Sequence, residues 1–321
     1  MSSTAAAPHP AVRHLDPAKF RDPAVTAKGE PRASVALRRL RTLWINTGTL
    51  CNIACANCYI ESSPRNDALS YITRAEAAAY LEEIAAGGWD TEEIGLTGGE
   101  PFMNPDIVGI LEDVMSRGLR CLVLTNAMRP MHRHKAALLD LKARYGALLA
   151  VRVSVDHYGQ AVHEAERGPR TWKPMVDGLV WLARNGFEPA VAGRGLSGEG
   201  LAEMRAGYAR LFAELGISLD VDDPARLVLF PEMDEQADVP EISVGCWSIL
   251  GKHPDQMMCA TSRMVVKRRG AERPSVVACT LLPYDPRFDL GPTLEGSRGP
   301  VPLNHPHCAK FCVLGGASCS A

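Results

Sequence analysis

Short apolar runs alternate with longer amphipathic segments between about residues 40 and 230. The apolar runs have the length of buried strands, whereas the amphipathic segments repeat apolar residues every three or four positions, as helices do. Such alternation predicts βα units and a mostly parallel sheet. The expected strands lie near 43–45 and at 93–97, 120–125, 149–155, 187–192, and either 217–221 or 227–230.

Helix boundaries are marked by capping residues and glycines. The first predicted helix begins at Thr73, where Glu76 completes a capping box, and it ends at Gly87. The later helices are expected from Pro105 to Gly118, at 131–145, at 172–185 and at 201–215. Past residue 240 the alternation fades, and the runs 264–270 and 275–278 predict a β-hairpin that turns around Gly270.

Composition limits the class of protein. Apolar residues make up 46% of the 321 residues and charged residues 22%, as in ordinary globular proteins, and no apolar run is long enough to span a bilayer. The net charge of −2 gives no basic field for nucleic acid. Residues 1–34 are rich in Ala, Pro and charge without the apolar core of a signal peptide, so we expect a flexible tail and a cytoplasmic protein.

Ten cysteines in a chain with no evident export signal favour metal or redox chemistry over disulfides. Three of them, Cys51, Cys55 and Cys58, stand in the run CNIACANCY directly after the first apolar run. Three thiolates can hold three irons of an iron–sulfur cube, which leaves the fourth iron open to a substrate or cofactor. A zinc site completed by a distant His or Cys is the alternative. We expect Cys121, inside an apolar run, to be a buried and inert thiol.

A second motif, TGGEP at 97–101, follows the second predicted strand. Gly98 and Gly99 permit backbone to approach a ligand closely, and Glu100 can pair with an ammonium group through a charge-assisted hydrogen bond. Together with the three cysteines and the aromatic Tyr59 that follows them, this motif resembles the radical S-adenosylmethionine (radical SAM) superfamily.

That resemblance implies a fold and a cofactor pair. The fold is α/β, a partial (β/α)6 barrel of the TIM type, open on one side, over about residues 40–230; six predicted βα units agree with it, because a closed TIM barrel has eight. The three cysteines are implied to hold a [4Fe–4S] cluster whose open iron binds SAM. Glu100, with Gly98 and Gly99, is implied to hold the SAM amino group, and Tyr59 to pack near the adenine.

Polar residues at later strand ends are further candidates to contact SAM, because parallel barrels present ligand-binding groups there. In the resembling family such residues contact the ribose or the carboxylate. The candidates are Thr125, Asn126, Ser154, Asp156 and Arg194, with Arg167 as a further carboxylate binder. The alternatives are loop capping by the Asn and Asp side chains and solvated surface positions for the arginines.

Six cysteines gather after residue 240: Cys246, Cys259, Cys279, Cys308, Cys312 and Cys319. Two of them flank the predicted hairpin, which resembles the SPASM and twitch extensions of radical SAM enzymes, where such a pair helps hold an auxiliary [4Fe–4S] cluster. The resemblance implies one such cluster, held by Cys259, Cys279 and two of Cys308, Cys312 and Cys319. A zinc site is the alternative, since spacing does not distinguish zinc from iron. Cys246 is a ligand, a catalytic thiol or a buried residue.

These patterns predict a tail at 1–34, a radical SAM core at 35–235 and a cysteine-rich auxiliary domain at 236–321. The expected function is reductive cleavage of SAM to a 5′-deoxyadenosyl radical, which takes a hydrogen atom from a small-molecule or peptide substrate. An electron donor such as flavodoxin or ferredoxin is the expected partner, without nucleic acid or membrane. Since the segment before residue 40 is short for a leader-binding domain, we expect any peptide substrate to be presented by another chain. The alternatives are an iron–sulfur electron-transfer protein and a zinc-stabilised binding module.

Overall fold

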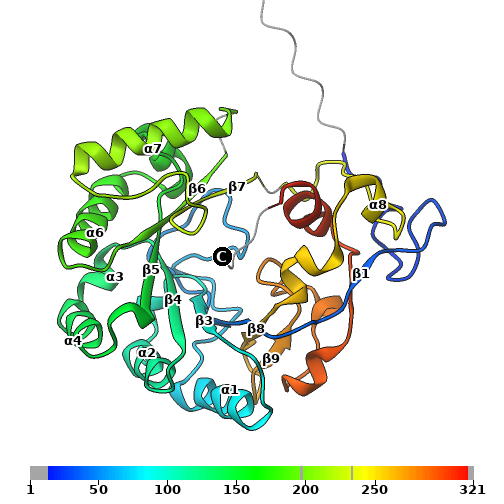
Figure 1. Cartoon of the computed structure of the whole chain (residues 1–321), viewed down its shortest axis with the longest axis horizontal. Helices are drawn as coiled ribbons and strands as arrows, with labels where there is room; N and C mark the ends of the chain where they lie inside the picture. Colours follow the sequence, from blue (N-terminus) through cyan, green and yellow to red (C-terminus); the bar gives the residue numbers. More distant parts are fainter. Residues whose placement is uncertain (1–13, 196–197, 233, 317–321) are drawn as a thin grey trace, which may run out of the picture.

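The computed structural model describes residues 14–195, 198–232 and 234–316 and is drawn in Figure 1. Within these residues an eight-stranded sheet has the order β7-β6-β5-β4-β3-β2-β8-β9. Its first six strands are parallel to their neighbours, which confirms the predicted partial (β/α)6 fold. They are β2 (Thr42–Asn46), β3 (Glu93–Thr97), β4 (Arg120–Thr125), β5 (Leu149–Ser154), β6 (Ala190–Arg194) and β7 (Leu227–Phe230).

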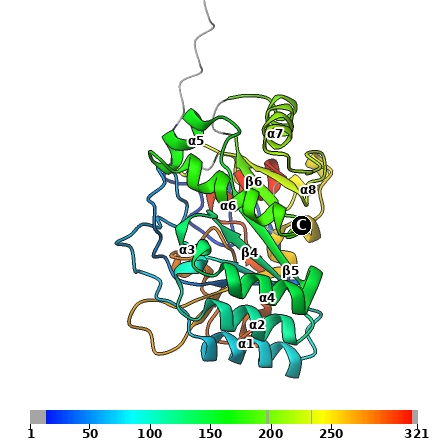
Figure 2. The same ribbon diagram turned by 90° about the vertical axis from the view of Figure 1, so that its left-hand side faces the viewer.

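Seven helices in the described part of the chain follow the barrel strands, and several stack along the outer face of the sheet in Figure 2. The capping box of Thr73 and Glu76 is present at the start of the first helix. The predicted helix 131–145 is broken around Arg133 into two helices, and the short helix α5 was not predicted. The helices are α1 (Arg74–Ala86), α2 (Ile107–Ser116), α3 (Arg129–His132), α4 (Lys135–Tyr145), α5 (Gln160–Arg167), α6 (Trp172–Arg184) and α7 (Leu201–Leu215).

The C-terminal hairpin extends the barrel sheet. Strands β8 (Ser262–Val266) and β9 (Ser275–Val277) are antiparallel, and Gly270 in the connection has φ +78°, so the predicted hairpin is confirmed. Strand β8 also pairs in parallel with β2, placing Arg263 opposite Leu43. The cysteine-rich segment is therefore joined by backbone hydrogen bonds to the strand that leads into the first three cysteines.

The described part of the N-terminal segment differs from a flexible tail. Arg32 is buried and forms an ion pair of 2.5 Å with Glu241, and Phe20 is buried beside it. Strand β1 (Ser34–Val35) pairs antiparallel with β10 (Val301–Pro302). Residues 14–35 are thus fastened to the C-terminal part of the chain by charge and backbone pairing, which apolar patterning does not reveal. Residues 1–13 lie outside the described part.

Two apolar clusters hold the fold together. One lies between the sheet and the outer helices and includes Leu43 and Ile45 of β2; the other includes Trp44 of the same strand and packs against the C-terminal segment. Strand β2 is buried on both faces, as expected for a strand inside a parallel sheet. None of the helices in the described residues has the length and apolarity needed to cross a membrane.

The contact between α6 and the turn after β4 yields a prediction. Gly178 of α6 is so close to this turn that an added Cβ would overlap the carbonyl oxygen of Ala127. We expect Gly178→Ala to destabilise the protein by ~1–3 kcal/mol, because backbone must shift to admit the methyl group. The measurement is the urea unfolding midpoint. Gly200→Ala is the control, since no atom lies within 4 Å of its added Cβ, and equal midpoints for the two variants would contradict the prediction.

Candidate functional site

The predicted cofactor residues meet at the carboxyl end of the barrel strands, where parallel barrels place their active sites. The loop after β2 carries Cys51, which is buried, and Cys55 and Cys58, which are half-buried. All three line one cavity of about 120 Å³. Its wall also contains predicted residues from the ends of β3, β4 and β5: Gly98, Gly99, Thr125, Asn126 and Ser154, with Tyr59 and Arg167 completing it.

The three thiols suit a metal–sulfur group. Burial raises the pKa of Cys51 to about 12 and that of Cys55 to about 11, so both are neutral until a metal displaces their protons. The Cys58 Sγ already accepts a hydrogen bond from the backbone N–H of Ser62 at 3.3 Å. In the described residues no three His, Cys, Asp or Glu side chains converge on one ion. An iron–sulfur cluster does not require the thiolates to converge on one point, because each thiolate binds a different iron.

The Gly-Gly-Glu turn lies against the start of the cysteine loop. Gly98 has φ +136°, and the N–H of Gly99 donates to the carbonyl of Gly48 at 2.7 Å. A side chain at Gly99 would overlap the Leu50 carbonyl. These glycines were expected to let backbone approach a ligand closely; in the structure the turn closely approaches the protein's own loop, at the carbonyls of Gly48 and Leu50. The turn therefore fixes where that loop begins.

Glu100 is held rigidly behind the cavity. It is 1% exposed, and its carboxylate accepts hydrogen bonds from the N–H of Phe102 (3.1 Å), the hydroxyl of Thr125 (2.8 Å) and the N–H of Asn126 (2.9 Å). Burial nevertheless raises its pKa to about 7. The hydroxyl of Thr125 thus binds Glu100, while the amide of Asn126 reaches Asn52 at 2.9 Å and joins this turn to the cysteine loop.

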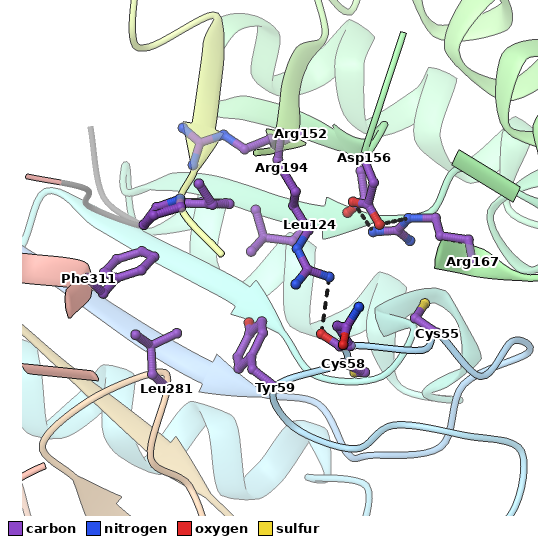
Figure 3. A pocket seen from close by; sticks show the side chains of 15 residues that line it. Cys55, Cys58, Tyr59, Leu124, Arg152, Asp156, Arg167, Arg194, Leu281 and Phe311 are labelled. Atoms are coloured by element: carbon purple, nitrogen blue, oxygen red, sulfur yellow. Dashed lines mark hydrogen bonds and ion pairs between the residues drawn. The ribbon is translucent and has the colours of Figure 1, made fainter. Parts of the chain in front are cut away.

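A second cavity, of about 130 Å³, adjoins the first and is seen in Figure 3. Asp156 and Arg167 form a two-pronged ion pair there, with both N···O distances 2.9 Å. Arg194 donates to the carboxylate of Glu166 at 2.5 Å and to the carbonyl of Asn57 at 3.1 Å. Asp156 is therefore an ion-pair partner rather than a loop cap, and neither arginine is a solvated surface residue.

Helix α5 supports the cysteine loop and was missed in the sequence. The Glu166 carboxylate accepts from the N–H of Asn57 at 3.0 Å and from its side-chain amide at 2.7 Å, and the Glu166 carbonyl accepts from the N–H of Ala56. The helix spans eight residues and buries His163 and Glu166 instead of an apolar stripe, so no helical periodicity signals it. The glycines on either side, Gly159 and Gly168, were the available boundary signals.

The remaining wall of the second cavity is mostly apolar, with one further guanidinium. Arg152 lies inside the barrel on β5 and is 4% exposed. Around it stand apolar side chains from β4, β7 and the C-terminal segment: Leu124, Phe230, Pro231, Leu281 and Phe311. Arg152 was not singled out in the sequence, because it sits within the apolar run of β5 without a motif.

Four of the C-terminal cysteines share a small apolar cavity of about 20 Å³: Cys259, Cys279, Cys308 and Cys312. Cys308 and Cys312 belong to one π-helix, Cys308–Leu314. Cys246, at the start of α8 (Cys246–Leu250), does not line this cavity, and its Sγ lies 3.6 Å from the Ser243 hydroxyl. Cys319 lies outside the described residues. Cys121 is buried in the core between sheet and helices, as predicted.

Leu281 joins the four-cysteine cavity to the site. It lines both that cavity and the 130 Å³ cavity, and it is 4% exposed. Phe311, which stands between Cys308 and Cys312 in the π-helix, also lines the larger cavity. The four C-terminal cysteines that share the small cavity therefore lie one side chain away from the space beside the first three cysteines.

Comparison with known proteins gives a consistent result. Residues 45–205 match the model of the radical SAM superfamily. The chain is 34% identical over 118 residues to the antilisterial bacteriocin subtilosin biosynthesis protein AlbA of Bacillus subtilis, and 28% identical over 141 residues to the AdoMet-dependent heme synthase of Nitratidesulfovibrio vulgaris. These matches cover 37% and 43% of this chain, but only 25% and 36% of the two relatives.

The fold resembles Streptococcus suis SuiB bound to S-adenosylmethionine, with a TM-score of 0.56 and 12% identity, over 79% of this chain and 63% of that one. This likeness supports the fold alone. The family model, by contrast, matches half of the sequence and spans both the cysteine motif and the Gly-Gly-Glu turn. The chain belongs to the radical SAM superfamily.

Proposed function

We propose that this radical SAM enzyme takes a hydrogen atom from a peptide side chain and holds a second, auxiliary [4Fe–4S] cluster. The observation that carries the first part is the convergence of Cys51, Cys55 and Cys58 with the Gly-Gly-Glu turn on one cavity at the carboxyl end of the barrel. Enzymes of this superfamily use a [4Fe–4S] cluster and SAM. When bound, the cluster supplies the electron that cleaves SAM to methionine and a 5′-deoxyadenosyl radical.

The protein's own residues bind and orient this pair. The three thiols lose their protons to hold the cluster, and the N–H groups of the loop are fixed by Glu166. Glu100 is proposed to attract the SAM amino group, because its carboxylate is immobile and close to the cavity. For the SAM carboxylate, Arg167 is better placed than Arg194, since Arg167 lines both cavities and Arg194 only the second.

Four other residues are proposed to contact SAM or to position a residue that does. Tyr59 lines both cavities, which suits packing against the adenine at their junction. Ser154 also lines both, so its hydroxyl can reach a ribose. Asn126 lines the smaller one. Asp156 is proposed to act by holding the Arg167 guanidinium in place through the two-pronged ion pair.

A peptide side chain is the proposed substrate group. AlbA is named for bacteriocin biosynthesis, and SuiB has been solved with its precursor peptide SuiA, a structure whose fold this chain matches with a TM-score of 0.53. The cavity of about 130 Å³ is smaller than the ~300–1,000 Å³ usual for drug-sized ligands, and its apolar wall suits one side chain. A small metabolite is the alternative substrate.

The auxiliary cluster is proposed at Cys259, Cys279, Cys308 and Cys312, because these four thiols line one buried cavity. Four thiolates occupy all four irons, so such a cluster has no open iron for substrate and is suited to electron transfer. A zinc site remains the alternative, and metal analysis separates the two. A flavodoxin or ferredoxin donor and a cytoplasmic location stay predictions.

The substrate proposal is tested with the anaerobically reconstituted enzyme, SAM and dithionite. Peptides encoded by genes next to its own are supplied one at a time, and products are examined by mass spectrometry. We expect 5′-deoxyadenosine formation to be coupled to a mass change in one peptide. Coupling to a small metabolite, with every peptide unchanged, would show the peptide proposal to be wrong.

Loss of a cluster ligand should abolish the first chemical step. We expect Cys55→Ala to form no 5′-deoxyadenosine above the dithionite-only background, because a cluster held by two thiolates is not retained. The control is Cys246→Ala, which changes a thiol that lines none of the three cavities described above. Product is measured by liquid chromatography, and activity retained by Cys55→Ala would exclude the cluster assignment.

Iron content tests the auxiliary site. Two [4Fe–4S] clusters give about eight irons per chain, and Cys308→Ala should reduce this to about four, while Cys246→Ala leaves it at about eight. Iron, zinc and labile sulfide are measured on the reconstituted protein. If the wild-type protein holds about four irons, the proposed auxiliary cluster is excluded. If it also holds one zinc per chain, the C-terminal cysteines bind zinc instead.

The affinity for SAM should depend on the charge of Glu100. Its pKa is raised to about 7, so the carboxyl becomes neutral as the pH falls through about 7, and attraction for the SAM ammonium is lost on the acid side. We expect Glu100→Gln to bind SAM about tenfold more weakly at high pH, or ~1.4 kcal/mol, and to lose this pH dependence.

The measurement is the dissociation constant of SAM for the cluster-loaded protein by calorimetry. Glu92→Gln is the matched control, because this exposed carboxylate lies at the opposite end of β3 and pairs with Arg41. A pH dependence that survives in Glu100→Gln would assign it to another group.

A further inference from the structure

A guanidinium is buried beside the four-cysteine cavity, and it has no carboxylate partner among the residues that the structure describes. Arg263, on β8, is 1% exposed and is among the largest fully buried side chains of the described residues. It donates hydrogen bonds to four backbone carbonyls, those of Cys259 (2.6 Å), Ser262 (2.8 Å), Ser297 (3.0 Å) and Gly299 (3.3 Å). These bonds use four of the five N–H donors but leave the positive charge uncompensated.

Two other arginines of the described residues, Arg32 and Arg167, have carboxylate partners. Arg32 pairs with Glu241, and Arg167 pairs with Asp156. For Arg263, in contrast, no carboxylate oxygen of the described residues lies within 4 Å. Removing a charge from water without a counter-charge is strongly unfavourable. A feature this costly indicates that the folded protein acquires an anion nearby.

Cys259 and Cys279 flank the hairpin whose first strand carries Arg263, and the guanidinium donates to the Cys259 carbonyl at 2.6 Å. Both cysteines line the cavity that they share with Cys308 and Cys312. Cysteine binds metals as the thiolate, so loading this cavity converts neutral thiols to anions. Four thiolates carry more negative charge than the metal core carries positive charge, so the loaded centre is a net anion in an apolar surrounding. This anion is the missing partner of the guanidinium.

We propose that Arg263 is the counter-charge of an anionic metal–thiolate centre held by Cys259, Cys279, Cys308 and Cys312. The inference rests on the auxiliary site of the proposed function. Arg263 does not line the cavity, so it acts by charge and through the Cys259 backbone, as a positioning residue and not as a ligand. Since adding an electron makes the centre more negative, the guanidinium favours the reduced form and raises the reduction potential.

The first test is a redox titration of the auxiliary cluster by electron paramagnetic resonance, in full-length protein carrying Cys55→Ala so that its signal stands alone. Arg263→Met removes the charge. We expect a ratio of reduced to oxidised cluster at least tenfold lower at a fixed potential, which is about 59 mV for a one-electron couple. Arg263→Lys, which keeps the charge, should stay near the parent value. A parent-like midpoint in Arg263→Met would overturn the proposal.

The matched control is Arg268→Gln. Arg268 lies two residues after the end of β8 and pairs with Asp289, and its side chain is 32% exposed. Removing this screened and paired charge should leave the midpoint unchanged. A shift as large as that of Arg263→Met would mean that any cation of this segment sets the potential, which also overturns the assignment to Arg263.

The second test separates charge compensation from a purely structural role. Thermal unfolding is compared between metal-free and metal-loaded protein, and the gain on loading is expected to be smaller in Arg263→Met than in wild type and restored in Arg263→Lys. If Arg263 only binds carbonyls, its replacement should lower the unfolding temperature of the metal-free and the metal-loaded protein equally. The increase in unfolding temperature on metal loading would then be unchanged, which would overturn the proposal. If Arg263→Met does not fold, Arg263→Gln supplies a neutral variant that still donates to carbonyls.

Metal content keeps the two proposals apart. If wild-type protein holds about four irons and no zinc, the auxiliary site itself fails and the counter-charge falls with it. If it holds about eight irons but neutral variants leave the midpoint and the loading gain unchanged, only the role of Arg263 fails. If the tail holds zinc, the centre is still a thiolate anion, and the loading experiment decides.

Discussion

The parallel pairing of β2 with a neighbour on each side is the constraint on which the site depends. On one side β2 pairs with β3 along its whole length, from Thr42 opposite Glu93 to Asn46 opposite Thr97, so the cysteine loop and the Gly-Gly-Glu turn leave the sheet at the same level. On the other side it pairs with β8, which follows Cys259. One strand thus sets the positions of both groups of cysteines relative to each other.

The sequence pattern predicted correctly those elements whose boundaries depend on neighbouring residues in the chain. Strands 93–97 and 120–125 have the boundaries expected from the sequence, because each is a buried run between turn residues. Apart from Glu100, which lies behind them, the predicted cofactor residues of the core line two adjoining cavities, since strand ends of a parallel barrel share one face. Helix α5 was not predicted because it buries His163 and Glu166 instead of an apolar stripe. The packing of residues 14–34 was not predicted because Arg32 and its partner Glu241 lie far apart in sequence.

The ion pairs around the cavities likewise could not be predicted from the sequence. Asp156, Arg167 and Arg194 were foreseen as polar strand-end or loop residues, but their partners come from other elements: α5 supplies Arg167 to Asp156 and Glu166 to Arg194. The glycines of the turn were foreseen as points of close approach, yet which backbone they approach depends on sheet register. A motif therefore names the residue type that a position needs, while the contact it makes follows from the fold.

The pairing of β8 with β2 also has a consequence for folding during synthesis. Strand β2 is made early, but the partner for one of its edges, Ser262–Val266, emerges more than two hundred residues later. Until then that edge presents unpaired N–H and C=O groups, and the strand that leads into the first three cysteines is paired on one side only. Completion of the sheet, and with it the final position of the cysteine loop, must therefore wait until β8 has been synthesised.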